Sequence, residues 1–592
     1  MHLPDPPYVL LDDARAGGAA ARLYSEPVDV IETADPGQVI KALERLRAAR
    51  KAGLHAAGFL HCEASAGLEP TAWRHMPAPD APLLWFGLFE SFQEIAGDSV
   101  TSLLPKPEGA WAGAPRPAID SHRYDAQFAR VAELIRAGDI YQANLTFRST
   151  IEFAGNPAAL YALLRGRAQA GYGALIDTGT RQLLSLSPEL FFRLDAGKLV
   201  ARPMKGTALR GATPDEDQKL ATELHDDPKQ RAENLMIVDL LRNDLSRVAR
   251  AGSVRVPELF SVEHYPTVHQ MVSTVTAELE EGLDAIDALV ALFPSGSITG
   301  APKVRAMQII EAVETAPRGI YTGAIGRLDA GGDAMFSVAI RTLSISKGAE
   351  GATLGLGSGV VADSLPQEEW RECLAKGAFV TNGERPFDLI ETMAFDPELG
   401  IPLLERHLAR MKASALTFGF AFDRHHVRNE LQAATFRLRE PTRIRLLLAR
   451  SGAIAIGNAP LPPIPTGPVR VAIAPMPVAP DDFRLSHKTS RRGFYERARD
   501  PEAFETVFTD PAGFLTEGSF TSIFVERDGR LVTPPLHRGL LPGVLRAELL
   551  GSGRAIEGDL RPRDLESGFF LGNALRGLVS AVPFAHSAIA KL

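Results

Sequence analysis

The stretch RAENLMIVDLLRNDL, at residues 231–245, decides how the first half of this sequence folds. Its apolar residues recur with helical spacing, which predicts a long amphipathic helix over residues 228–248. Glu233 falls at the edge of the buried face, immediately before the apolar run Leu235-Met236-Ile237-Val238. A carboxylate in that position is available to a site beside the core.

Helices and strands alternate on both sides of this stretch. The pattern predicts a helix over 124–137, an extended segment over 142–149 and a hairpin-like pair over 181–194. A strand over 336–343 would place Arg341 beside the small residues Ser337 and Ala339, leaving room for its guanidinium to bind a ligand carboxylate. An arginine that simply emerges into solvent is the alternative. Together these elements indicate a mixed α/β (α+β) fold with sizeable sheets.

Composition excludes several classes of function. The 592 residues are 45% hydrophobic, enough for more than one core. A net charge of -8 supplies no broad cationic surface, so nucleic acid is not expected as a partner. The N-terminus MHLPDPPYVL does not resemble a signal peptide, and no apolar stretch reaches the roughly 18 residues of a membrane helix, so we expect a cytoplasmic protein without membrane contact. Cys62 and Cys373 give neither a disulfide framework nor a thiolate metal site.

A short polar segment at 377–386 separates two patterns. We therefore predict a first domain over 1–376, whose residues 1–120 form a variable N-terminal part, a linker over 377–386, and a second domain over 387–592. The proline-rich segment APLPPIPTGP at 459–468 can be neither helix interior nor central strand, so it is expected to link two lobes of the second domain.

Carboxylates on two predicted helices suggest a hard cation. Ser364 and Gln367 have the spacing of a capping box, which would open a helix running through Lys376. Glu369 and Glu372 then lie on one face of it. Together with Glu233, and without any Cys or His cluster, they suit Mg²⁺. Solvated helix faces with charge pairs are the alternative.

A glycine-rich loop, FPSGSITGAPK at 293–303, runs into another predicted helix. Lys303 and Arg305 in its first turn oppose the helix dipole, an arrangement that favours a bound anion there. A plain surface loop fits the pattern equally well.

Several of these segments, in one order, resemble the chorismate-utilising family that includes anthranilate, isochorismate, salicylate and aminodeoxychorismate synthases. The matching motifs are GDIYQANLT, SPELFF, RPMKGT, RAENLMIVDLLRNDL, FPSGSITGAPK, GIYTGAIG, VAIRTL and GSGVVADS, between residues 138 and 376. The resemblance implies a large layered fold that binds chorismate, with Mg²⁺ held by Glu233 and Glu372, and with Glu369 beside them. It assigns Glu189 as general acid and His269 as a catalytic histidine. It implies substrate contacts from Gln142, Thr207, Thr299, Tyr321, Arg341, Gly357 and Gly359.

Two positions bear on which member of the family this is. Relatives that add water carry a lysine where this chain has Gln142, so the chain resembles the aminating members. Lys205 resembles the lysine of aminodeoxychorismate synthase component I, where anthranilate synthases have a small residue. An unprotonated Lys205 would attack chorismate at carbon 2, and ammonia would then replace it by adding at carbon 4. The alternative is that Lys205 only pairs with a substrate carboxylate.

The second domain resembles fold-type IV pyridoxal 5'-phosphate enzymes, which comprise branched-chain and D-amino-acid aminotransferases and aminodeoxychorismate lyase. The motifs are FDLIETM, LERHLARM, SHKT, TEGSFTSIF, TPP and GLLPGV, in that order from residue 387. The resemblance places the cofactor on Lys488 and its ring nitrogen against Glu517. It places the phosphate near Arg410, the amides of Gly543 and Val544, and Asn573. It also implies a homodimer through this two-lobed domain.

The fusion favours one function over its rivals. A lyase that consumes 4-amino-4-deoxychorismate is the logical successor to the first site, so the sequence predicts synthesis of 4-aminobenzoate from chorismate. Neither cysteine lies in a glutaminase motif, so ammonia is expected from a separate glutamine amidotransferase subunit. The alternatives are anthranilate synthase component I fused to a class IV aminotransferase, and a scaffold without catalysis.

Overall fold

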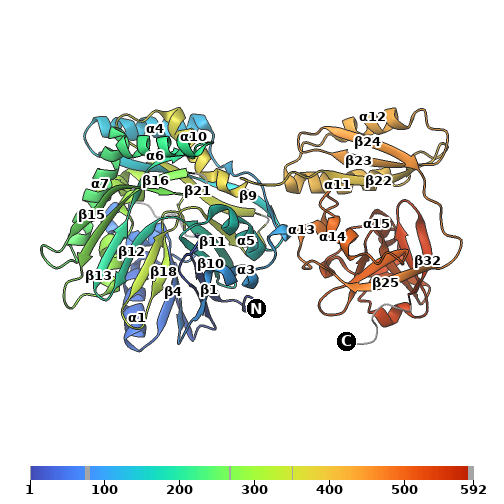
Figure 1. Ribbon diagram of the computed structural model, residues 1–592, viewed down its shortest axis with the longest axis horizontal. Coiled ribbons are helices and arrows are strands. Elements are labelled where there is room, and N and C mark those ends of the chain that lie inside the picture. The colour runs from blue at the N-terminus through green and yellow to red at the C-terminus, as the bar shows by residue number, and fades with distance from the viewer. Residues whose placement is uncertain (1, 74–80, 266–267, 350, 585–592) are drawn as a thin grey trace. The chain divides into compact units, whose positions relative to one another are not determined.

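The computed structural model describes residues 2–73, 81–265, 268–349 and 351–584. The chain divides into two compact units, each a mixture of helices and strands (Figure 1). The first unit comprises Met1–Pro105, Ala114–Glu152 and Tyr161–Gly383. The second comprises Lys106–Gly113, Phe153–Leu160 and Glu384–Leu592. Two short segments from the first part of the chain are therefore grouped with the C-terminal unit.

The first unit is built on two large sheets. One sheet has the strand order β17 (Gly300–Ala301), β9 (Gln142–Ala154), β21 (Gly351–Val360), β20 (Thr342–Ser346), β11 (Arg181–Ser187), β10 (Tyr172–Asp177), β1 (Tyr8–Asp12), β2 (Ala21–Ser25) and β6 (Gln93–Ile95), with β8 (Arg116–Pro117) also paired to β9. The short strand β7 (Trp111–Ala112) pairs with Phe153 and Ala154 at the end of β9, and these residues are grouped with the second unit. The other sheet has the order β14 (Met204–Leu209), β16 (Val268–Glu278), β13 (Lys198–Arg202), β12 (Leu190–Asp195), β19 (Ala334–Val338), β18 (Ala324–Leu328), β4 (His55–Leu60), β5 (Leu84–Phe89) and β3 (Asp29–Thr33), with β15 (Arg255–His264) paired to β16.

Apolar side chains from both sheets form a shared core. Val9 and Ile176 of the first sheet lie in one buried cluster with Phe59 and Trp85 of the second. The other face of the second sheet is covered by helices. Their residue ranges are α1 (Val39–Lys51), α7 (Pro228–Ser246) and α8 (Ala285–Leu292). This layered α/β arrangement is the fold class that the sequence predicts.

Local sequence explains where the helix α7 begins. The side chain of Asp227 accepts hydrogen bonds from the backbone N–H groups of Lys229 and Gln230, and Pro228 occupies the first helical position, so α7 begins there. Its apolar stripe, which includes Ile237 and Leu241, is buried against the second sheet. The prediction of a helix over 228–248 is confirmed to within two residues.

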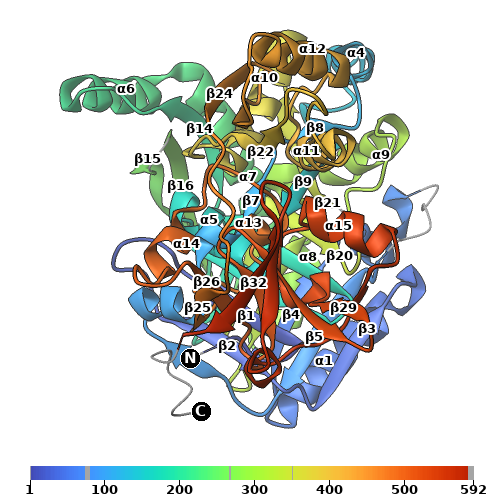
Figure 2. The same cartoon turned by 90° about the vertical axis from the view of Figure 1, so that its right-hand side faces the viewer.

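The remaining helices of the first unit are α4 (Ser121–Arg136), α5 (Pro157–Ala168), α6 (Pro214–Asp226), α9 (Lys303–Val313) and α10 (Pro366–Gly377), together with the single turns α2 (Ser65–Leu68) and α3 (Val100–Leu103). Figures 1 and 2 both show α4 beside α10, and the two helices are in contact. The predicted helix over 124–137 corresponds to α4, and the predicted extended segment over 142–149 to the first part of β9.

Two strand predictions are wrong for a common reason. Residues 336–343 do not form one strand, because the chain passes from β19 in one sheet to β20 in the other and Arg341 adopts a φ of +50° at the crossing. Residues 181–194 do not form a hairpin, since β11 and β12 also belong to different sheets. Alternation within a segment indicates strands but does not reveal that the chain changes layer between them.

The predicted capping box at Ser364 is also wrong. The helix α10 begins at Pro366, its N-cap is Leu365, and no side chain caps it. Ser364 lies one residue too early, and its hydroxyl instead accepts from the backbone N–H of Val361 and donates to Glu369. The proline, rather than the serine, marks the start of the helix.

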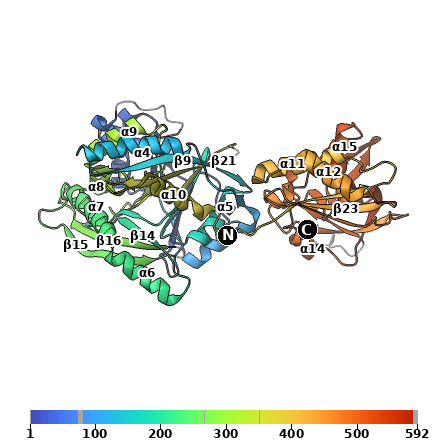
Figure 3. The ribbon, with the colours of Figure 1, turned by 90° about the horizontal axis from the view of Figure 1, so that it is seen from above.

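The second unit has two lobes. One lobe is a three-stranded sheet of β22 (Leu389–Phe395), β23 (Thr442–Leu448) and β24 (Ile454–Pro460), packed against α11 (Leu404–Phe418) and α12 (Arg424–Thr435), as Figure 3 shows. The other is an eight-stranded sheet in the order β27 (Leu515–Gly518), β26 (Glu505–Thr509), β25 (Val469–Pro475), β32 (Gly577–Pro583), β31 (Phe569–Asn573), β28 (Ser522–Arg527), β29 (Arg530–Thr533) and β30 (Ala555–Glu557). It carries α13 (Phe483–Ser486), α14 (Gly493–Ala498) and α15 (Val544–Gly551).

A tryptophan far away in sequence completes the core of the first of these lobes. Trp111 is buried and lies edge-on to Phe418, with ring centroids 4.9 Å apart. The same cluster contains Phe387 and Phe483, and the indole N–H donates to the Glu384 carboxylate. The unit that folds around α11 therefore includes a side chain outside residues 387–592.

We expect Trp111→Ala to destabilise the second unit by about 3–5 kcal/mol, because it removes a large buried ring and leaves a cavity. Hydrogen exchange of the α11 and β23 amides in urea measures the effect locally. Phe436→Ala is the matched control, since that ring is 74% exposed. Equal protection in the two variants would contradict the proposed contribution of Trp111 to this core.

Candidate active sites

Lys205 lies where elements of both sheets and α7 meet. It belongs to β14, and its Nζ is 3.0 Å from Oε2 of Glu233 on α7. A Cβ added to Gly359 of β21 would lie 2.8 Å from this Nζ and 2.9 Å from Nε2 of Gln142. The structure thus brings Lys205, Glu233, Gln142 and Gly359 together, and a side chain at position 359 would crowd the ends of the Lys205 and Gln142 side chains.

Gln142 has an unusual environment for a polar side chain. It is fully buried at the start of β9, and neither its amide nitrogen nor its amide oxygen has a hydrogen-bond partner among the described residues. An unpaired buried amide is costly. Because it lies beside Lys205 and the bare backbone of Gly359, we interpret it as a group that a ligand would satisfy.

Glu189 is a buried carboxyl in the same region. It lies just before β12 and accepts a hydrogen bond of 2.7 Å from the Ser297 hydroxyl. Burial raises the pKa of Glu189 to about 7, although the Ser297 hydrogen bond and the charges of Lys376 and Lys205 act in the opposite direction. A carboxyl that stays protonated near neutrality can act as a general acid.

The carboxylates predicted to bind a metal each have a protein partner. Glu372 Oε1 is 2.7 Å from Nζ of Lys376 on α10. Burial would raise the pKa of Glu372, but Lys376 outweighs this and lowers it. Glu369 is buried and accepts from Ser364 at 2.7 Å. No group of three metal-ligating side chains occurs in the part of the chain that the structure describes, so the Mg²⁺ site stays a prediction.

His269 is held by neighbours on both ring nitrogens. Its Nε2 lies 2.9 Å from Asp217 Oδ1, and its Nδ1 lies 2.7 Å from Nδ1 of His264. The nearby Thr207 is exposed and accepts from the Gln270 side chain at 2.9 Å. None of these contacts connects His269 or Thr207 with the residues around Lys205. The catalytic role of His269 and the substrate-binding role of Thr207 therefore stay predictions.

Arg341 does not lie within a strand, as the sequence predicts, but between β19 and β20. Its backbone turns at the crossing between sheets, and no acceptor contacts its guanidinium within the described ranges. Burial lowers the pKa of Arg341. Tyr321 is buried with its ring directly over Gly355, where any Cβ would overlap the ring. A buried arginine without a protein acceptor suits a carboxylate ligand.

The glycine-rich loop has partners within the protein. Thr299 donates its hydroxyl to the Ser295 carbonyl at 3.0 Å, and Arg318 donates to the Ile298 carbonyl at 3.0 Å. Lys303 forms an ion pair of 2.5 Å with Asp244, and Arg305 one of 2.7 Å with Asp139. Protein carboxylates therefore account for the two cations at the start of α9, and the predicted anion is not needed to explain them.

The backbone carbonyl of Gly357 on β21 accepts a hydrogen bond of 3.0 Å from Nζ of Lys376.

In the second unit, Lys488 follows α13 and is held against β22, where its carbonyl accepts from the Ile390 N–H at 2.9 Å. Burial lowers the pKa of Lys488 to about 7, and the positive charge of Arg410 acts in the same direction. A lysine whose pKa lies near neutrality has a substantial unprotonated fraction at neutral pH, which suits imine chemistry and proton transfer.

Glu517 is a second buried carboxyl in this unit. Its carboxylate accepts a short hydrogen bond from the Tyr495 hydroxyl. Burial raises the pKa of Glu517 to about 7, although the positive charge of Arg492 acts to lower it. A carboxyl of this kind lacks a fixed cationic partner and can accept a hydrogen bond from a protonated ring nitrogen. The residues present therefore fit the pyridine end of pyridoxal phosphate.

The other end of the predicted cofactor site lies at the start of α15. A Cβ added to Gly543 would lie 2.6 Å from the Ser522 hydroxyl oxygen, so a side chain there would require that hydroxyl to move. Val544 is the first residue of α15, and the backbone N–H groups at the start of a helix favour binding of a phosphate. Arg410 donates to the Pro542 carbonyl at 3.1 Å and so lies beside this amide pair. Asn573 uses its side-chain oxygen to accept from the Leu575 and Arg576 N–H groups.

Sequence analysis missed the partner that holds Arg410. Glu391 on β22 accepts from Arg410 Nε at 2.9 Å and Nη2 at 2.6 Å, and His407 Nδ1 lies 2.6 Å from it. Burial acts to raise the pKa of Glu391, but Arg410 and His407 lower it to about 2. A glutamate in an apolar strand, FDLIETM, was the available signal, because buried carboxylates are rarely unpaired.

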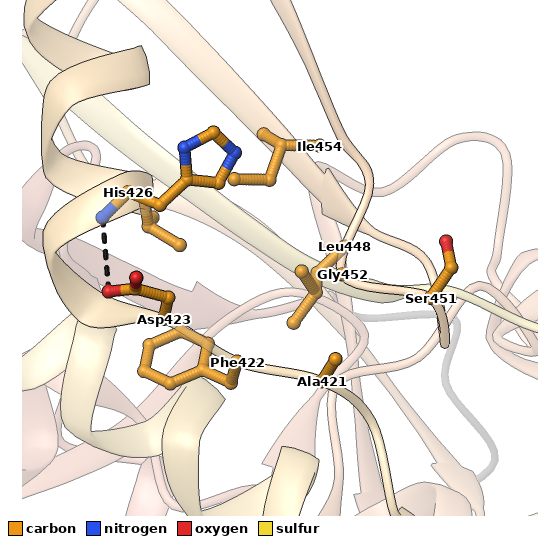
Figure 4. A pocket seen from close by; sticks show the side chains of 9 residues that line it. Ala421, Phe422, Asp423, His426, Leu448, Ser451, Gly452 and Ile454 are labelled. Carbon is orange, nitrogen blue, oxygen red and sulfur yellow. Dashed lines mark hydrogen bonds between the residues drawn. The ribbon is translucent and has the colours of Figure 1, made fainter.

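Two hollows on the second unit contain none of these residues. One, of about 350 Å³, lies between α12 and β24 and is mostly apolar (Figure 4). Its Asp423 caps the helix through the backbone N–H of His426. The other, of about 510 Å³, is lined by Ala472–Ala474, Ala498–Glu502, Thr506 and Phe584. Neither is lined by a lysine, a cysteine or a buried carboxyl, so neither competes with the two sites above.

Comparison with known proteins assigns both units. Residues 6–382 match the model of the chorismate binding enzyme family, and residues 388–582 match that of amino-transferase class IV. The aminodeoxychorismate synthase component 1 of Escherichia coli is 46% identical over 254 residues, which are 43% of this chain and 56% of that protein. The anthranilate synthase component 1 of Aquifex aeolicus is 43% identical over 247 residues, 42% of this chain and 50% of that protein.

The chain thus spans about half the length of these curated relatives. Among solved structures, anthranilate synthase component I from Streptococcus pneumoniae aligns with a TM-score of 0.54 at 28% identity, covering 62% of this chain and 93% of that one. None of the helices within the described residues is long and apolar enough to span a bilayer.

Proposed function

This chain belongs to the chorismate binding enzyme family and also carries an amino-transferase class IV domain, and from that pairing we propose that it converts chorismate to 4-aminobenzoate. The first unit would aminate chorismate to 4-amino-4-deoxychorismate. The second would eliminate pyruvate from this product. The observation that carries the proposal is Lys205, whose amine lies among Glu233, Gln142 and the bare backbone of Gly359.

In the first reaction, Lys205 Nζ forms a bond to carbon 2 of chorismate, both ring double bonds shift by one position, and the 4-hydroxyl leaves. Glu189 donates the proton with which that hydroxyl departs as water. Ammonia then forms a bond to carbon 4, both double bonds return to their original positions, and Lys205 is released. Glu233 and Glu372 offer the oxygen ligands that Mg²⁺ prefers, and the ion would supply positive charge for a substrate carboxylate. Arg341 and Gln142 would hold the remaining polar groups of the substrate.

The pKa of Glu189 predicts how the first reaction depends on pH. A general acid must be protonated, so with a pKa of about 7 the rate of chorismate consumption should fall about tenfold per pH unit above neutrality, at constant free ammonia. Ser297→Ala removes a hydrogen bond that stabilises the carboxylate, so the fall should move to higher pH. A profile that is flat from pH 6 to 9 would remove Glu189 from this role.

In the second reaction, Lys488 would take the proton from carbon 4 of 4-amino-4-deoxychorismate. Pyridoxal phosphate, when bound, withdraws electrons from the carbon that bears the amine. The bond from carbon 3 to the enolpyruvyl oxygen then breaks, the ring becomes aromatic, and protonation of the enolpyruvate by Lys488 gives pyruvate. Glu517 would hold the ring nitrogen of the cofactor, while Arg410 and the amides of Gly543 and Val544 would hold its phosphate.

Anthranilate synthase fused to an aminotransferase is the second candidate, because some relatives of the first unit carry that name. Lys205 disfavours this candidate, because anthranilate synthases have a small residue at the corresponding position. The two readings give different isomers of aminobenzoate. A scaffold without catalysis is disfavoured by the perturbed pKa values of Glu189 and Lys488.

The deciding experiment incubates the pyridoxal-loaded protein with chorismate, Mg²⁺ and ammonium, and identifies the aromatic product by chromatography. We expect 4-aminobenzoate with one equivalent of pyruvate. Glutamine alone should give no product, because burial raises the pKa of Cys62 to about 12 and that of Cys373 to about 11, leaving no reactive thiolate. The nitrogen source would be a separate glutamine amidotransferase subunit. Formation of 2-aminobenzoate would overturn the proposed function, and full activity on glutamine would overturn the separate subunit.

A cytoplasmic location and a homodimer through the second unit complete the proposal. The homodimer rests on the resemblance to fold-type IV enzymes. Sedimentation of the pure protein tests the dimer directly.

A further inference from the structure

Arg318, between α9 and β18, is a buried arginine outside the set of site residues predicted from sequence. Its guanidinium forms a fork on Glu314, with Nε 2.9 Å from Oε2 and Nη2 2.6 Å from Oε1. The same group donates from Nη1 to the Ile298 carbonyl at 3.0 Å and from Nη2 to the Asn144 carbonyl at 2.6 Å. One side chain therefore joins three segments that are far apart in sequence.

The contacts of Arg318 differ from those of Arg341. Nε, Nη1 and Nη2 of Arg318 all donate to acceptors within the protein, whereas no acceptor contacts the Arg341 guanidinium within the described ranges. The backbone is fixed as well, since the N–H groups of Arg318 and Gly319 donate to the Glu63 carboxylate at 2.5 and 3.0 Å. A guanidinium held in this way acts on the site through the atoms that it holds, rather than as a ligand for the substrate.

The Ile298 carbonyl belongs to the loop that supports Glu189. Residues Gly296–Ile298 form a single 3₁₀ turn, and no side chain caps it. Within that turn, Ser297 donates its hydroxyl to Glu189 Oε1 at 2.7 Å. Because Ile298 is the next residue, the hydrogen bond from Arg318 limits how far the Ser297 hydroxyl can move away from Glu189.

The Asn144 carbonyl belongs to β9. Asn144 lies two residues after Gln142, whose buried amide has no partner among the described residues. The Asn144 N–H donates to the Thr299 carbonyl at 2.9 Å, and its carbonyl accepts from Arg318. Glu314, the ion-pair partner of that arginine, accepts from a further N–H of β9 at 2.8 Å. The ion pair thus fixes the start of β9 against the loop of residues 295–299.

We propose that Arg318 is a positioning residue for the first reaction, which holds the Ser297 hydroxyl on Glu189 and the start of β9 at Gln142 in one arrangement. The inference rests on the proposed amination of chorismate, in which Glu189 is the general acid. Because Arg318 donates to protein acceptors, its loss acts on the reaction through Ser297 and Glu189. A displacement of about 1 Å at a reacting site can slow a reaction on the order of 100-fold.

Arg318→Lys is the first variant of the test. Lysine keeps a positive charge opposite Glu314, but its single ammonium cannot reproduce the planar fork on both carbonyls. The pKa of Glu189 should then rise, because the Ser297 hydrogen bond lowers it. The fall of chorismate consumption with pH should move upward as far as in Ser297→Ala, and kcat at neutral pH should drop about 10- to 100-fold. Arg136→Lys makes the same exchange at an exposed position of α4 and is the matched control.

A double-mutant cycle separates positioning from a contribution to stability alone. If Arg318 acts through Ser297, Arg318→Lys/Ser297→Ala should shift the pH profile no further than Ser297→Ala does by itself. Lys205 and Lys376, whose charges also act on Glu189, are the same in every variant. Shifts that add, or a profile of Arg318→Lys identical to that of the parent protein, would overturn the inference.

Arg318→Gln/Glu314→Gln provides the same test if Arg318→Lys does not fold. It removes both buried charges together, so neither is left unpaired, and thermal unfolding verifies that the variant is folded. The new amides cannot hold both carbonyls, so the upward shift is expected again, and an unchanged profile would overturn the inference.

Hydrogen exchange separates this inference from the proposed function, because it needs no substrate. The amides of residues 142–146 and 296–299 should exchange about tenfold faster in Arg318→Lys than in the parent protein. Equal exchange in the two proteins would overturn the positioning role and leave the amination of chorismate standing. Faster exchange in a chain whose parent consumes no chorismate would support the hold on these segments and overturn the proposed function.

Discussion

Lys488→Ala is expected to stop 4-aminobenzoate formation while chorismate continues to be consumed. The variant lacks the amine that takes the proton from carbon 4 and returns one to the enolpyruvate, so the second reaction should slow by at least ~10³-fold. 4-Amino-4-deoxychorismate should accumulate, and pyruvate should not be released. Chromatography of the ammonium reaction, with pyruvate assayed by lactate dehydrogenase, measures all three species.

Lys412→Ala is the control for this experiment. Lys412 is an exposed residue of α11 in the same unit, so its removal changes the charge equally without touching either site. Its product ratio should equal that of the parent. Continued 4-aminobenzoate formation by Lys488→Ala would mean that the second unit has another task, and transamination of an amino acid would then be the first activity to test.

The helices α4 and α7 of the first unit were predictable from sequence because their periodicity is local. The helix of residues 228–248 and the alternation around it depend on nearest neighbours along the chain, and α7 and α4 appear where the spacing indicated. The layer changes at 339–341 and 188–189 were not predictable in this way. They depend on which of two sheets a strand joins, and only tertiary packing decides that.

The candidate sites show the same division. Motif resemblance named Lys205, Glu189, Lys488 and Glu517, and the structure adds the burial and the neighbouring side chains of each. The motifs alone could not identify Glu391, which holds Arg410, or Ser297, which holds Glu189, because these contacts join residues far apart in sequence. Trp111 is missed for the same reason, since its ring is buried in a core formed almost entirely by residues after 386.

Two readings of Lys205 make different predictions, and a pair of variants separates them. As a nucleophile, Lys205 forms a covalent bond that no other side chain replaces, so Lys205→Ala should slow chorismate consumption by at least ~10³-fold. Lys205→Arg keeps the positive charge but cannot attack, and it should be as slow. If Lys205 only paired with a substrate carboxylate, Lys205→Arg would retain most of kcat and Lys205→Ala would mainly raise KM.

Both variants should still convert supplied 4-amino-4-deoxychorismate to 4-aminobenzoate at near the parental rate, because Lys205 belongs to the first unit and Lys488 to the second. Lys198→Ala, at an exposed position of β13, is the control for loss of a lysine in the first unit. If Lys205→Ala abolished the second reaction in a folded, pyridoxal-loaded protein, the two sites would not be independent. Slow consumption with an intact second reaction would instead place the covalent step on Lys205, where the 3.0 Å contact with Glu233 holds its amine.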